Sequence, residues 1–220
     1  MKKRILFIGD SITDAGRYRA EATDLGKGYP LLIAGKLISQ YPTMEFECMN
    51  RGIGGDKIAD LQVRWQEDCL ALQPDYVSIL IGINDTWHNT SDQAIFGTEK
   101  SAQQFESVYR KLLNELQTAE ICNIILMEPF VLPITDDRHG WRKDLDPKIQ
   151  IVRTKEKRII GFAQADVQQS EERLDQRPSG KLIQHTLVTK ENTEEIQKKF
   201  AEYLMLEAKK RRIKSIFAQF

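Results

Sequence analysis

A short apolar run that ends on a small, polar turn constrains the fold of this chain more than any other feature. The run is Ile5–Ile8, and Gly9, Asp10 and Ser11 follow it at once. Such a run is typical of a strand that is covered on both faces in a parallel sheet. Ser11 would then lie at the carboxyl edge of the sheet, where open α/β sheets bind their ligands. The alternative is an ordinary turn in which Asp10 and Ser11 only cap the next helix.

Two further segments repeat this strand-then-turn pattern. Residues 50–56, Asn-Arg-Gly-Ile-Gly-Gly-Asp, follow the apolar stretch 46–49, and residues 82–85, Gly-Ile-Asn-Asp, follow the stretch 76–81. In a parallel sheet all three turns lie on one edge, so a serine, a glycine-rich backbone and an asparagine side chain converge. Acyl transfer needs this set, because it requires a nucleophile and N–H donors aimed at the developing oxyanion.

The three segments resemble, in order, spacing and strand context, the first three sequence blocks of the SGNH/GDSL hydrolases, which are serine esterases and acylhydrolases. The resemblance covers roughly residues 4–150. It implies that Ser11 is the nucleophile. It also implies that the Gly55 N–H, the Asn84 side-chain amide and the Ser11 N–H bind the oxyanion. The implied fold is a three-layer α/β/α, flavodoxin-like domain with a parallel five-stranded sheet in the order 2-1-3-4-5, spanning residues 1–220.

The fourth block of the family is missing from this chain. The family carries Asp-x-x-His shortly before a C-terminal helix, where the histidine is the general base and the aspartate orients it. In the corresponding segment, 184–191, Gln184 stands at the aspartate position and Leu187 at the histidine position. Two interpretations stay open. One is a serine ester hydrolase that acts on small acyl or acetyl esters, with catalysis impaired by the missing Asp-x-x-His block. The other is a non-catalytic binding protein with the same fold.

Only three histidines are available as a base: His88, His139 and His185. We expect His88 on the rim of the cleft and His139 in a solvated loop. His185 is the candidate base because it lies in the segment that the family uses, although it is two residues from the expected place. Without an aspartate to hold its tautomer, we expect either weak esterase activity that depends on His185 or none.

Residues from about 154 onwards are atypical of a folded core. Residues 154–158 have no apolar face, and residues 168–172 are polar throughout. Three explanations compete: divergence to a non-catalytic protein, a non-standard base, or an altered reading frame.

Composition suits one enzyme domain, and the acyl transfer that the resemblance implies needs no cofactor. A chain of 220 residues can bury a substantial core, and a formal net charge of zero gives no bulk attraction to nucleic acid or to an anionic membrane. We therefore expect a small-molecule ester as the partner, with no nucleic acid and no membrane; the oligomeric state stays open. The glycines of residues 52–55 lack the phosphate-loop spacing, which disfavours a nucleotide-binding module.

The three cysteines indicate a reducing compartment. Cys48, Cys69 and Cys122 are odd in number and lack metal-ligand spacing, so we expect buried free thiols and no metal. The N-terminal apolar run is too short for a signal peptide, and no stretch approaches the roughly 20 apolar residues that span a bilayer. These features predict a cytoplasmic protein.

Hydrophobic periodicity predicts alternating strands and helices, which indicates a parallel sheet covered by helices on both faces. The expected strands are 4–8, 45–49, 75–81, 121–127 and 159–163, and the expected helices are 29–40, 56–72, 99–117, 146–158 and 193–212.

Overall fold

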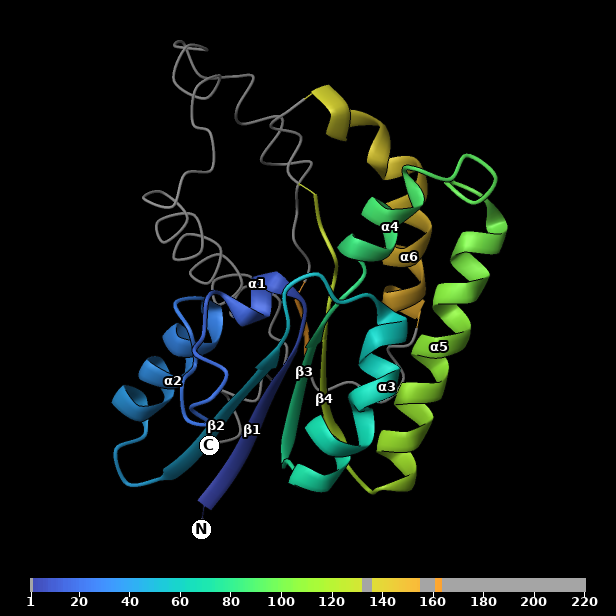
Figure 1. The fold of residues 1–220 in the computed structure, drawn as a ribbon. Coiled ribbons are helices and arrows are strands. Elements are labelled where there is room, and N and C mark those ends of the chain that lie inside the picture. Colours follow the sequence, from blue (N-terminus) through green and yellow to red (C-terminus); the bar gives the residue numbers. More distant parts are fainter. Residues whose placement is uncertain (1, 132–135, 155–160, 164–220) are drawn as a thin grey trace.

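The computed structural model describes residues 2–131, 136–154 and 161–163, in which strands and helices alternate (Figure 1). The strands are β1 (Lys2–Gly9), β2 (Glu45–Gly52), β3 (Tyr76–Leu80), β4 (Asn123–Met127) and β5 (Gly161–Ala163). The α-helices are α1 (Ser11–Asp14), α2 (Tyr29–Gln40), α3 (Ile58–Asp68), α4 (Ile83–Asn89), α5 (Glu99–Thr118) and α6 (Arg142–Thr154). Two 3₁₀ helices are η1 (Leu70–Leu72) and η2 (Asp136–Trp141).

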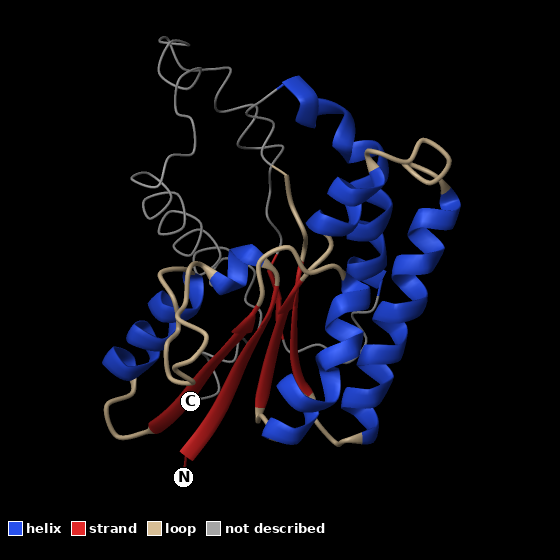
Figure 2. Ribbon diagram, in the orientation of Figure 1, coloured by secondary structure: helices blue, strands red, loops and turns tan. Residues whose placement is uncertain are grey.

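The five strands form one parallel sheet in the order β2-β1-β3-β4-β5, which confirms the predicted order 2-1-3-4-5. Helices α1 and α2 lie on one side of the sheet, and α3, α5 and α6 lie on the other (Figure 2). Strand β1 has a neighbour on each side and a helical layer over each face. This position explains why its run Ile5–Ile8 is apolar without alternation.

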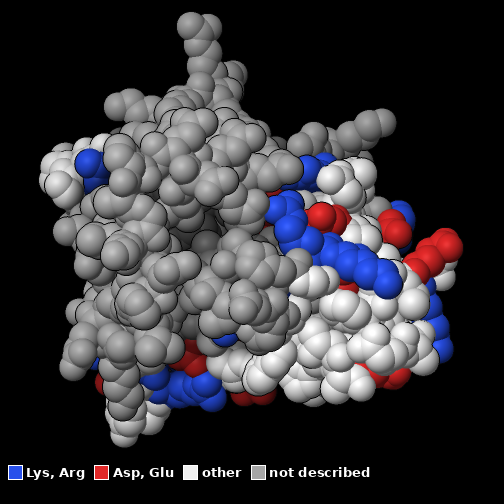
Figure 3. Space-filling view, turned by 90° about the horizontal axis from the view of Figure 1, so that it is seen from above, with Lys and Arg blue, Asp and Glu red and all other residues white. Residues whose placement is uncertain are grey.

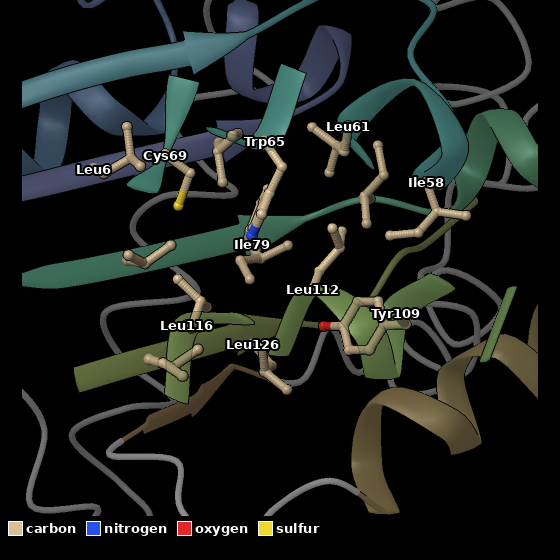
Figure 4. Close-up of a cluster of buried hydrophobic side chains, with 14 of the residues drawn as sticks. Leu6, Ile58, Leu61, Trp65, Cys69, Ile79, Tyr109, Leu112, Leu116 and Leu126 are labelled. Atoms are coloured by element: carbon tan, nitrogen blue, oxygen red, sulfur yellow. The ribbon is translucent and has the colours of Figure 1, made fainter. Parts of the chain in front are cut away.

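Alternate side chains of β1 supply two separate cores, because successive residues of a strand point to opposite faces. Leu6 and Ile8 join the larger cluster between the sheet and helices α3 and α5, where Trp65 is the largest buried side chain (Figure 4). Ile5 and Phe7 join the smaller cluster under α2. Side chains of this one strand therefore anchor the sheet in the cores on both of its faces.

The strand register brings three turns to one edge. Gly9, the last residue of β1, pairs with Gly52 of β2 on one side and with Leu80 of β3 on the other. The chain leaves all three strands at this level, so the segments that follow start side by side.

Several sequence predictions need correction in detail. Helix α4 was not predicted, since it is short and its sequence is polar. Helix α6 begins at Arg142 rather than at 146 and contains Pro147 in its interior. Cys122 precedes β4 and is exposed, not buried, whereas Cys69 is buried as expected and Cys48 is partly buried. The predicted helix 193–212 lies outside the described residues.

Seen from above, the described surface carries side chains of both charge signs (Figure 3). Within the described ranges, no helix combines the length and the apolar character that crossing a membrane requires.

A buried ion pair links helices α4, α5 and α6. Lys148 and Asp144 of α6 are each 1% exposed, and the Lys148 ammonium donates to the Asp144 carboxylate. Lys148 also donates to Ser101 Oγ of α5 at 2.8 Å, and Ser101 Oγ donates to Asp144 Oδ1 at 2.8 Å. Asn89, at the end of α4, donates to Ser101 Oγ at 2.8 Å. Burial alone would raise the pKa of Asp144, but the donors around it, Lys148 first, hold that pKa below its usual range.

We predict that Lys148→Met destabilises the protein by about 3–5 kcal/mol, because it leaves Asp144 as a buried charge without its cation. Urea unfolding at neutral pH measures the effect. The matched control is Lys111→Met, which removes an exposed i,i+4 ion pair with Glu115 on α5 and is expected to change stability by less than about 0.5 kcal/mol. Equal effects of the two substitutions would contradict the role of burial.

Candidate active site

Ser11 stands at the point where β1 gives way to α1. Asp10 caps this short helix: it has an extended backbone, and its carboxylate accepts the Ile12 N–H at 3.0 Å. The Ser11 side chain is exposed. Both interpretations of the turn therefore hold at once, because Asp10 is the cap and the serine hydroxyl remains accessible at the edge of the sheet.

The serine turn rests directly on the end of β2. A Cβ atom at Gly52 would lie 2.2 Å from the Asp14 backbone nitrogen, so only glycine allows this close approach. The Asp14 carboxylate, which is buried, accepts the Gly54 N–H at 3.0 Å and a hydrogen bond from Arg19 at 2.5 Å. A Cβ atom at Gly54 would stand 3.7 Å from the Cβ of Ser11. The glycine-rich loop thus lies against the serine.

Gly55 is exposed and adopts a positive backbone φ. Its φ is +91°, which favours glycine, and nothing lies within 4 Å of the place that a Cβ would take. Among the described residues, neither the Gly55 N–H nor the Ser11 N–H has a hydrogen-bond acceptor. Two backbone donors next to the serine are therefore available to a ligand.

Asn84 comes from the first turn of α4 and is tied to the same loop. Its side-chain amide is buried and donates one hydrogen bond to the Asp56 carbonyl at 3.0 Å. The next residue, Asp85, accepts the Ile58 N–H at 3.1 and 3.2 Å and so caps α3. An amide group has two N–H bonds, so Asn84 keeps a second donor for a ligand.

No histidine side chain in the described ranges makes a contact with Ser11. His88 lies in the last turn of α4, is exposed and makes an edge contact with Trp87. The backbone of His139 belongs to η2, and its side chain lies outside the description. His185, Gln184 and Leu187 also lie outside the described residues, so the base stays a prediction.

Three supporting residues were missed from the sequence. Asp14 and Arg64 contact the loop that carries Gly55, and Arg19 holds Asp14. Charged side chains such as these are too common in a sequence to single out a site. Within the described part of the chain, no group of three or more His, Cys, Asp or Glu residues is placed to hold a metal ion.

The edge of the sheet also holds two carboxyl groups whose pKa is raised, those of Asp10 and Asp85. Burial raises the pKa of Asp10 to about 7, and the negative charges of Asp85 and Asp56 add to the effect. Burial likewise raises the pKa of Asp85 to about 6. Asp10 Oδ2 is buried and finds no hydrogen-bond partner among the residues that the structure describes, which is consistent with a carboxyl that resists ionisation.

Comparison with known proteins identifies the class. A model described as the GDSL-like lipase/acylhydrolase family matches residues 7–179. The chain therefore belongs to the GDSL-like lipase/acylhydrolase family. This confirms the resemblance drawn from the three sequence blocks.

Individual relatives within this family are named by their substrates. An acetylxylan esterase from Geobacillus stearothermophilus is 36% identical over 155 residues, which are 69% of this chain and 70% of that protein. A crystal structure of the acetylxylan esterase from that organism matches with a TM-score of 0.65 and 34% identity, over 77% of this chain and 80% of that one. A variant of the organism's acetyl-xylooligosaccharide esterase matches over 92% of this chain and 94% of that one, with a TM-score of 0.69 and 30% identity.

Three of the similar structures are catalytic mutants of the acetylxylan esterase. In them a serine, an aspartate and a histidine that follows the aspartate by three positions are each replaced by alanine. The named relatives are esterases, so the comparisons give no support to the non-catalytic interpretation.

We predict that Asp10→Asn flattens the pH dependence of stability. A carboxyl with a raised pKa in the folded state binds its proton more tightly there than in the unfolded chain. Its favourable contribution is therefore complete below about pH 4 and is lost as the pH rises towards about 7, by at most about 1.4 kcal/mol per pH unit. Relative to the wild type, Asp10→Asn should gain stability over this interval and then remain constant.

Urea unfolding between about pH 4 and pH 8 measures this difference in free energy of unfolding. Asp92→Asn is the control for the loss of an exposed surface carboxylate. A constant difference for Asp10→Asn would contradict the prediction.

Proposed function

We propose that this protein is a serine ester hydrolase that removes small acyl groups, acetyl groups above all, from a carbohydrate. The observation that carries the proposal is the exposed Ser11 beside two backbone N–H groups, its own and that of Gly55, for which the described residues provide no acceptor. Asn84 adds a side-chain amide that is fixed to the same loop.

The reaction follows from this arrangement. Ser11 Oγ attacks the ester carbonyl while a base takes its proton, and the carbonyl oxygen becomes an oxyanion. The Ser11 and Gly55 N–H groups and the Asn84 amide donate to that oxyanion. The alcohol leaves with the proton from the base, which gives an acyl-Ser11 ester. Water then attacks this ester through the same steps and releases the carboxylic acid. Removing one oxyanion donor typically costs about a hundred- to a thousand-fold in turnover.

The proposed substrate class rests on the relatives and on one side chain. Two of the similar proteins are named as an acetylxylan esterase and an acetyl-xylooligosaccharide esterase. Trp87 is 53% exposed and follows Asn84 by three residues on α4, so the two side chains share one face of that helix. An exposed aromatic ring on this face suits the apolar side of a sugar ring. Acetylated xylo-oligosaccharides should therefore be deacetylated in preference to esters of long acyl chains.

We predict that Ser11→Ala abolishes both ester turnover and covalent labelling. A serine hydroxyl reacts with a fluorophosphonate only when it is activated. Mass spectrometry of the labelled protein and hydrolysis of p-nitrophenyl acetate measure the two properties. Ser91→Ala is the control, because Ser91 is exposed and lies outside the proposed site.

Unchanged turnover in Ser11→Ala would refute the assignment of the nucleophile. A folded wild-type protein that is neither labelled nor active would instead favour the binding protein suggested by Gln184 and Leu187.

We predict that His185→Ala removes the remaining activity if the wild-type protein turns over esters at all. Of the three histidines, His185 is the one in the segment where the family places its base. A general base contributes about 10²–10⁴-fold, and the wild-type rate should itself be low because no aspartate stands three residues before His185. Steady-state kinetics of His185→Ala, with His88→Ala and His139→Ala as matched controls, measure the effect. Robust activity that survives His185→Ala would contradict this prediction.

A further inference from the structure

One arginine of α3 touches two of the three segments that carry the proposed catalytic groups. The Arg64 guanidinium donates through Nη2 to the carbonyl of Gly9, two residues before Ser11, at 3.2 Å. Through Nη1 it donates to the carbonyl of Arg51 at 2.7 Å, and through Nε to the carboxylate of Asp56 at 2.8 Å. Nη1 also donates to Asp68, one turn along the same helix, at 2.8 Å. The Arg64 side chain is only 14% exposed.

Asp56 extends this set of contacts to the third segment. Its carboxylate binds Arg64, and its backbone carbonyl accepts the Asn84 amide at 3.0 Å. Asp56 also follows Gly55 directly in the chain. The guanidinium therefore binds the end of β1 directly. Through Asp56 it is also linked to Gly55, which is the preceding residue, and to Asn84, which binds the Asp56 carbonyl.

We propose that Arg64 is a positioning residue for acyl transfer, which sets the spacing between the Ser11 turn, the Gly55 N–H and the Asn84 amide. The inference rests on the proposed function of these three groups. Arg64 does not touch the reacting atoms; it acts through the Gly9 carbonyl and through Asp56. Its effect is on geometry, because the donors that bind an oxyanion must already stand at the right distance before charge develops.

Lysine cannot replace arginine in this role. A guanidinium is planar and presents five N–H donors in a fixed fork, whereas an ammonium is a compact charge on a flexible stem. Arg64 binds acceptors from β1, β2, the glycine-rich loop and α3 at the same time. Lysine would retain the charge beside Asp56 but not the span from Asp56 to the Gly9 carbonyl.

The test compares Arg64→Lys with Asp68→Asn. Arg64→Lys should lower kcat by roughly 10- to 100-fold with KM changed less than about threefold, since a small misplacement of catalytic groups can cost about 10²-fold. Asp68→Asn removes the negative charge from a partner of the same guanidinium, and this partner belongs to none of the three catalytic segments. Its kcat should therefore stay within about threefold of the wild type. Both are measured on a small acetyl ester well below the unfolding midpoint of each variant. A role confined to stability would lower the midpoint and leave kcat of the folded protein unchanged.

A second variant covers the case in which Arg64→Lys does not fold. Asp56→Asn keeps the backbone carbonyl that binds Asn84 but removes the charge that holds Arg64, and it should show the same fall in kcat at constant KM. A wild-type kcat in a folded Arg64→Lys or Asp56→Asn variant would overturn the proposal, and so would an equal loss in Asp68→Asn. Failure of the proposed function itself looks different, because the wild-type protein would then neither turn over the ester nor be labelled at Ser11.

Discussion

The alignment of three strand ends is the constraint on which the rest of the structure depends. Gly9 of β1 is level with Gly52 of β2 and Leu80 of β3, so the serine turn, the glycine-rich loop and the start of α4 leave the sheet together. A slip of one residue in either pairing would also turn the side chains of β1 to the wrong face. Leu6 and Ile8 would lose the larger core, and Ile5 and Phe7 would lose the smaller one. Burial on two sides thus fixes the position of a solvent-exposed serine.

Polar contacts refine what the register begins. Asp14 holds the Gly54 N–H, Asp85 caps α3, and Asn84 binds the Asp56 carbonyl. Asp14 and Asn84 each join one catalytic segment to another, and Asp85 joins the third segment to α3. Each contact uses a charged or amide side chain. The network of Lys148, Asp144 and Ser101 works further from the edge, where it fixes the far end of α4 against α5 and α6. The short helix that presents Asn84 is therefore held at both ends.

The sequence alone predicted the parallel sheet, because strands buried on both faces leave continuous apolar runs such as Ile5–Ile8. The strand order was implied by the family resemblance, and the structure confirms it. Glycine and asparagine mark the turns that follow three of the strands, and the catalytic roles assigned to those turns stay predictions. The sequence did not predict α4, whose residues carry no apolar stripe, and it placed Cys122 inside the protein although it precedes the strand. Arg64 was also missed, since the acceptors that give this arginine its role come from four separate parts of the chain. Long-range partners of a single charged side chain leave no local pattern to read.

The close approach at Gly52 shows that mutational tolerance and chemical participation are different properties. Gly52 holds no proton, binds no substrate and donates nothing to the oxyanion in the proposed reaction. Yet the space that its side chain would need is already filled by the backbone of the serine turn. Selection for turnover would therefore restrict this position to glycine as strictly as it restricts a reacting group. An enzyme engineer who takes intolerance of substitution as a sign of catalysis would misjudge Gly52. At this edge of the sheet, Gly52 is needed for the short distance between two backbone segments and takes no part in the chemistry.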